Sequence, residues 1–125
     1  MKKTTCEWLA KAEQDYSAAA SLIRRRHIPA DVVCFHCQQM AEKYLKGLLQ
    51  ENNTHFTKTH DLEILGELAR PLVPSISLLQ NDFEALTDYA VKFRYPGCDA
   101  TPAKAKAAVA AAKRIRVAVR LALGQ

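Results

Sequence analysis

The chain has 125 residues, of which 49% are hydrophobic and 25% are charged, and it contains only four glycines and five prolines. This composition is ordinary for one globular domain with a packed core, and it favours helices over strands. No uninterrupted apolar run approaches the roughly 18 residues of a transmembrane helix, and the basic start lacks the apolar core of a signal peptide. We therefore expect a single domain over residues 1–125, located in the cytoplasm and not associated with a membrane.

Helical periodicity predicts a first helix over residues 4–26 and a second over residues 30–51, separated by Pro29. In the second helix, apolar residues recur at steps of three and four over a wide arc, which is typical of a central helix with neighbours on several sides. These residues are Cys34, Cys37, Ala41, Tyr44, Leu45, Leu48 and Leu49. The Cys34 and Cys37 thiols lie in mid-helix on this apolar side, which favours core packing over a redox or zinc site. We expect no metal and no cofactor.

Polar residues of the second helix are the candidates for a functional site. Gln38 and Glu42 project into the apolar arc, and a buried carboxylate needs a partner because an unpaired one is costly. Gln39, Lys43 and Lys46 share the other face. They could contact a phosphate, or they could simply be the solvated face of an amphipathic helix.

The remainder of the chain predicts three further helices. A polar loop over residues 54–60 precedes a helix that Asp61 opens, and Pro71 and Pro74 close it. A fourth helix is expected over residues 77–93, with a loop at residues 94–100. Thr101 and Pro102 then form an N-cap and a first-turn proline, which start a fifth helix over residues 102–123. No alternating strand pattern occurs, so we expect an all-α bundle with short connections.

The last helix holds the basic excess of a chain whose formal charge is +5, because no acid occurs from Thr101 onward. Four of its basic residues follow each other at spacings of seven, three and four and would form one stripe: Lys106, Lys113, Arg116 and Arg120. Such a stripe is a feature of nucleic-acid binding proteins, and it is equally the solvated face of a terminal helix. The sequence does not separate the two.

Three stretches in order resemble the HEPN domain family, the "higher eukaryote and prokaryote nucleotide-binding" helical domains. They are residues 35–46 (FHCQQMAEKYLK), residues 58–62 (KTHDL) and residues 90–96 (AVKFRYP). The resemblance covers nearly the whole chain. It implies an up-and-down four-helix bundle with an additional short helix, and often a homodimer. It also implies a nucleotide or RNA ligand and a minimal nucleotidyltransferase partner in a toxin–antitoxin-like pair.

One departure from the family matters for catalysis. Ribonuclease members carry an arginine followed, after four to six residues, by a histidine, and none of the four histidines here has an arginine at that spacing. The chain is therefore similar to the non-nuclease branch, and we expect no enzymatic activity and no RNA cleavage. A ribonuclease toxin with a non-standard active site and a purely structural dimeric subunit remain as alternatives.

The expected site unites residues from all three stretches. We predict that Arg94, at the end of the fourth helix, pairs with Glu42, supported by His60, Asp61 and Tyr95. This group is either a buried polar clamp or a ligand pocket.

Overall fold

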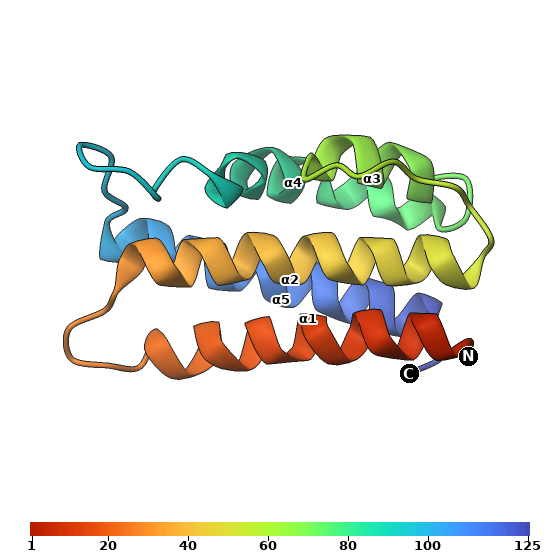
Figure 1. The fold of residues 1–125 in the computed structure, drawn as a ribbon, viewed down its shortest axis with the longest axis horizontal. Helices are drawn as coiled ribbons and strands as arrows, with labels where there is room; N and C mark the ends of the chain where they lie inside the picture. The colour runs from red at the N-terminus through yellow and green to blue at the C-terminus, as the bar shows by residue number, and fades with distance from the viewer.

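The computed structural model describes residues 1–125 and is entirely helical (Figure 1). Its α-helices are α1 (Lys3–Leu22), α2 (Ala30–Glu51), α3 (Leu62–Ala69), α4 (Gln80–Leu86) and α5 (Pro102–Ala122). Two 3₁₀ segments, η1 (Pro74–Leu79) and η2 (Thr87–Ala90), flank α4. The all-α prediction is confirmed.

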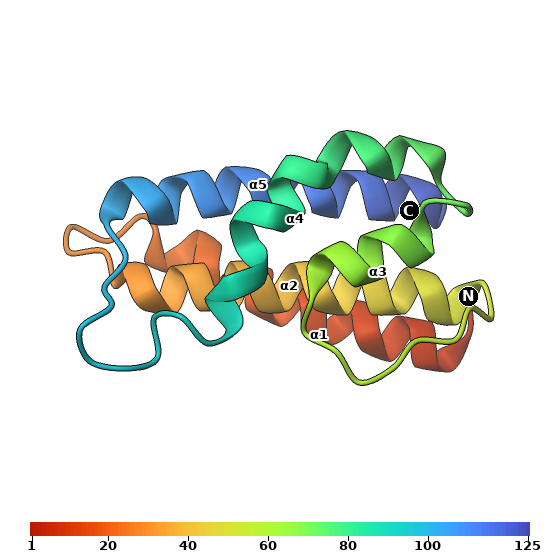
Figure 2. The same ribbon diagram turned by 90° about the horizontal axis from the view of Figure 1, so that it is seen from above.

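The helices form an up-and-down bundle. Figures 1 and 2 show that α1 and α2 run in opposite directions, that the η1–α4–η2 segment returns along the bundle, and that α5 runs back in the direction of α2. The short α3 is the additional helix, and it lies over α2 beside the start of α4. None of the helices combines the length and apolar character that crossing a membrane requires.

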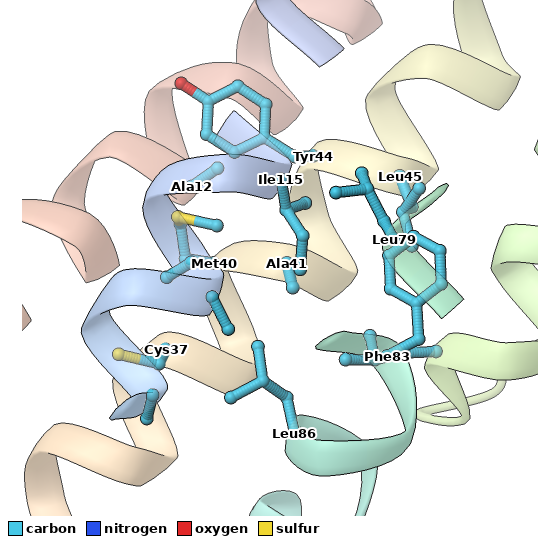
Figure 3. Close-up of a cluster of buried hydrophobic side chains, with 14 of the residues drawn as sticks. Ala12, Cys37, Met40, Ala41, Tyr44, Leu45, Leu79, Phe83, Leu86 and Ile115 are labelled. Atoms are coloured by element: carbon cyan, nitrogen blue, oxygen red, sulfur yellow. The ribbon is translucent and has the colours of Figure 1, made fainter. Parts of the chain in front are cut away.

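The second helix is central, as its wide apolar arc predicted. It packs against α1, α5, α3, α4 and η2. Its seven predicted apolar residues are at most 1% exposed. Figure 3 shows Cys37, Met40, Ala41, Tyr44 and Leu45 of α2 meeting side chains from the other elements. The core therefore forms around α2 on three sides.

Two boundaries differ from the sequence prediction. Helix α1 ends at Leu22, so the arginines at positions 24–26 follow the helix instead of forming its last turn. The predicted helix over residues 77–93 is instead the broken segment η1–α4–η2, which ends at Ala90. At the second break, the hydroxyl of Thr87 accepts the Leu62 N–H at 3.0 Å, so this segment also caps the start of α3. The segment still buries Leu79, Phe83, Leu86 and Ala90, and Phe93 just beyond it is buried as well.

The start of α5 is as predicted. The Thr101 hydroxyl accepts the Lys104 N–H at 3.1 Å, and Pro102 occupies the first turn.

Candidate functional site

A row of polar side chains is buried along α2. Gln38, Glu42 and Lys46 are 0%, 4% and 7% exposed, and their four-residue spacing places them one turn apart. Gln38 Nε2 donates to Glu42 Oε1 at 3.2 Å, and Lys46 Nζ donates to Glu42 Oε2 at 3.0 Å. Both oxygens of the buried carboxylate thus have a donor from the same helix.

The loop over residues 54–60 supplies a third partner. His60 Nδ1 lies 2.8 Å from Glu42 Oε1, and Gln38 Nε2 also donates to the His60 carbonyl at 3.0 Å. Gln39 Nε2 donates to Gln38 Oε1 at 2.7 Å. The His60 side chain is 70% exposed although Glu42 is buried, and its Nε2 has no hydrogen-bond partner in the protein. The group Gln38, Gln39, Glu42, Lys46 and His60 is called the Glu42 cluster below.

The burial of Lys46 was not foreseen, because the sequence placed it on a solvated face. Trp8 of α1 and Phe56 of the loop cover it, with ring centres 5.7 and 6.0 Å from Nζ. These two rings contact each other edge to face. Cation–π attraction therefore adds to the Glu42 pair in holding the ammonium group.

The predicted pair between Glu42 and Arg94 is wrong. Glu42 is already bonded by Lys46, His60 and Gln38, whereas Arg94 is exposed and its guanidinium lies 5.9 Å from the ring centre of Phe35. The physical reason is that η2 ends at Ala90, so Arg94 follows a turn instead of ending a helix. Tyr95 is 64% exposed and does not join the cluster either.

Arg94 instead belongs to a second group, at the end of the bundle where α2 and α5 begin. A pocket of about 380 Å³ is lined here by Asp31, Val32, Phe35, Phe93 and Arg94. Lys92 Nζ and Lys104 Nζ lie 5.5 and 5.8 Å from the Phe93 ring centre. The Asp31 carboxylate accepts the Ala100 N–H at 2.6 Å, which ties the loop to the start of α2. We call this group, with its two lysines, the Arg94 corner.

The sequence did not single out the aromatic residues of the Arg94 corner. Phe35 lies within the stretch that resembles the family and Phe93 lies beside Arg94, but nothing local shows that the two stretches meet.

Lys43 and Asp61 each have partners outside the Glu42 cluster. Lys43 Nζ donates to Asp15 Oδ2 of α1 at 2.6 Å, and His36 Nδ1 lies 2.8 Å from the other oxygen of Asp15. Lys43 thus forms an ion pair between α1 and α2, and its ammonium group is not free to contact a phosphate. Asp61 is the N-cap of α3 and accepts the N–H groups of Glu63 and Ile64. Neither residue contacts the Glu42 carboxylate.

Two of the four residues of the predicted basic stripe pair with Glu13 of α1. Arg116 Nε and Nη2 donate to the Glu13 carboxylate at 2.6 and 3.1 Å, and Arg120 lies 3.7 Å from it. The hydrogen bond from Arg116 lowers the pKa of Glu13, and the same bond raises the pKa of Arg116. Lys106 and Lys113 are exposed and form no ion pair. Only half of the stripe therefore presents free charge.

The two cysteines of α2 are buried in the core, as expected from their positions. Burial raises the pKa of Cys34 to about 11 and that of Cys37 to about 12, from an ordinary value of 9.0. We expect a thiol reagent at pH 9 to label exposed Cys6 in the folded protein but to label Cys34 and Cys37 only after unfolding. Peptide mapping by mass spectrometry measures this. Equal labelling of Cys37 and Cys6 in the folded protein would contradict the burial.

Comparison with known proteins gives one match. No curated protein and no solved structure matches the chain significantly. The HEPN domain family matches residues 5–121, which include all five helices except the first two residues of α1 and the last residue of α5. The stretches that hold the Glu42 cluster and the Arg94 corner both lie within this match. The chain belongs to the HEPN domain family.

Proposed function

We propose that this HEPN domain is a non-catalytic module that binds a nucleotide or single-stranded RNA at the Arg94 corner. The observation that supports this most strongly is that the exposed Arg94 guanidinium lies near the half-buried Phe35 ring, with Lys92 and Lys104 beside the buried ring of Phe93. Exposed cations beside aromatic rings suit a ligand that has both a phosphate and a flat base. Proteins bind single strands in this way, with bases stacked on rings and cations beside the backbone.

The charges and dimensions of the corner agree with this ligand class. Asp31 is the only acid that lines the pocket, and its carboxylate already accepts the Ala100 N–H. The pocket volume of about 380 Å³ lies within the roughly 300–1,000 Å³ of small-molecule sites. Val32 in the pocket lining is exposed, as are Val91 and Tyr95, which lie close to Arg94 in the chain.

Titration of a fluorescein-labelled single-stranded RNA, followed by anisotropy, tests the proposal. Phe35→Leu keeps an apolar side chain but removes the ring, and we expect it to weaken binding about 5- to 150-fold, the equivalent of one lost stacked base. Arg94→Ala is expected to weaken binding to a similar degree. Arg25→Ala is the matched control, because it removes one exposed, unpaired arginine outside the corner. It should change the affinity by less than about twofold.

Equal losses for Arg94→Ala and Arg25→Ala would contradict the corner as the site, because the binding would then depend only on net charge. Absence of RNA binding at low salt would contradict the RNA ligand. The same titration with a fluorescent mononucleotide then decides whether a nucleotide alone is bound.

We further propose that the module works in the cytoplasm as a homodimer, together with a minimal nucleotidyltransferase in a toxin–antitoxin-like pair. Membership of the HEPN family supports this part of the proposal. Sedimentation of the purified chain at tens of micromolar tests the dimer, and a monomer throughout would contradict it.

Growth of cells that express the chain with and without a nucleotidyltransferase tests the pair. No difference in growth would contradict that role.

A second candidate, a ribonuclease with a non-standard active site, has one observation in its favour. The buried Glu42 carboxylate holds Nδ1 of His60 and leaves Nε2 exposed, an arrangement in which histidine can act as a general base. RNA supplies its own nucleophile, the 2′-hydroxyl, so the site would need no nucleophilic side chain. Cleavage of RNA that His60→Ala abolishes would support this candidate. Under the main proposal, purified protein leaves the RNA intact.

A further inference from the structure

The outer face of α5 has an exposed row of residues that is apolar except at one position. Its residues follow each other at alternating steps of four and three, which is the heptad spacing of a helix that packs along a second helix. All are exposed: Ala103, Ala107, Ala110, Arg114, Val117 and Leu121. The one charged member, Arg114, forms a bidentate pair with Asp82 of α4 at 2.8 and 3.0 Å. We call this row the α5 seam.

A groove of about 760 Å³ lies beside the C-terminal half of the seam, between α5 and η1. Seven of its ten lining residues are hydrophobic, and three of them are large and exposed. Leu78, Leu121 and Val117 are 84%, 71% and 55% exposed. Large apolar side chains gathered on one surface indicate an interaction site.

The charges along the seam distinguish between possible occupants. Lys106 and Lys113 flank it at a spacing of seven residues, the position from which charged side chains contact the partner helix in a coiled coil. Both are exposed and form no ion pair. Neither α5 nor the lining of the groove contains an acid. The flank that α5 supplies is therefore positive, and the Asp82 carboxylate of α4 is already paired with Arg114.

A second copy of the chain fits this surface poorly. Antiparallel pairing of α5 with itself would bring Lys106 and Lys113 of one copy near those of the other, and parallel pairing would bring the two Arg114 side chains together. Like charges at these positions disfavour association. A helix with leucine-like residues on one face and carboxylates beside them fits both the seam and its flank.

We propose that the α5 seam binds an acidic amphipathic helix of a partner protein. This proposal does not depend on ligand binding at the Arg94 corner, because the two surfaces share no residue. The test uses the full chain and two synthetic peptides of about three heptads, both with leucine at the apolar positions. One peptide has glutamate at the flanking positions and the other has lysine. Fluorescence anisotropy measures their binding.

We expect the glutamate peptide to bind and the lysine peptide not to bind. Lys106→Glu combined with Lys113→Glu should weaken binding of the glutamate peptide at least about tenfold, since two attractive pairs become repulsive. The same variant should bind the lysine peptide more tightly than the unchanged chain does. Lys3→Glu combined with Lys11→Glu is the matched control on α1 and should change binding less than about twofold. Val117→Asp should abolish binding, whereas Ile64→Asp, at a similarly exposed position of α3, should not.

Three results would overturn the proposal. The first is no binding of the glutamate peptide, and the second is equal binding of both peptides. The third is a self-associated chain that Val117→Asp converts to a monomer in sedimentation, which would assign the seam to a second copy. Circular dichroism of each variant verifies that the helices remain folded.

Discussion

Replacing Glu42 by alanine is expected to lower the free energy of unfolding by about 3–5 kcal/mol, as when one member of a buried ion pair is removed. Glu42 is 4% exposed, and the ammonium of Lys46, itself 7% exposed, lies 3.0 Å from its Oε2. Without the carboxylate, a positive charge remains buried with no anion beside it. The rings of Trp8 and Phe56 compensate only in part, because a cation–π contact is worth about 0.5–2 kcal/mol. Urea denaturation followed by circular dichroism measures the loss.

A second substitution separates the charge effect from lost packing. Lys46→Met removes the stranded cation and keeps an apolar stem, so the variant with both Glu42→Ala and Lys46→Met should be more stable than Glu42→Ala alone. His60→Ala is the control, because the His60 ring is 70% exposed and its loss should cost less than about 1 kcal/mol. Losses that are small and strictly additive would show that Glu42 and Lys46 do not act as a pair.

Replacing Phe83 of α4 by alanine should lower the free energy of unfolding by a similar amount, about 3–5 kcal/mol. The ring is 1% exposed, and Figure 3 shows it beside Leu45 of α2 and Leu79 of η1. Truncation leaves a cavity at the point where the broken η1–α4–η2 segment is held against the bundle. Leu78→Ala is the control, since Leu78 is 84% exposed and should change stability by less than about 0.5 kcal/mol. Thermal and urea unfolding both measure the difference, and similar losses for the two variants would contradict the assigned core.

Gly66 explains how the Phe83 ring comes so close to α3. A Cβ atom at Gly66 would lie 2.7 and 2.8 Å from Cε2 and Cδ2 of the ring, closer than packed carbon atoms approach. Gly66→Ala should therefore destabilise the fold, because overpacking costs about 1–3 kcal/mol. The better helix propensity of alanine offsets at most about 1 kcal/mol of this cost. Phe83→Leu, which removes the far ring atoms, should reduce the cost of Gly66→Ala in the variant that has both changes. An unchanged cost would mean that the ring is not the obstacle.

The sequence alone determined the helical class and the central place of α2. The apolar steps through Cys34, Cys37, Ala41 and Leu45 are a local pattern, and a helix buries whichever side such a pattern makes apolar. The same holds for the start of α5, because an N-cap such as Thr101 acts within one turn of the chain. The burial of Gln38 and Glu42 also followed from their places in the apolar arc.

Only the tertiary structure decided which groups meet the buried charges. From the sequence we predicted that Arg94 pairs with Glu42. In the structure, the loop over residues 54–60 folds back and brings His60 to the carboxylate and Phe56 to Lys46. Arg116 and Glu13 are 103 residues apart, so no local pattern could reveal that they neutralise each other. Periodicity shows which face of a helix is buried, because that depends on nearest neighbours along the chain. The choice among several possible ionic partners depends on the paths of the loops, which only the packed bundle determines.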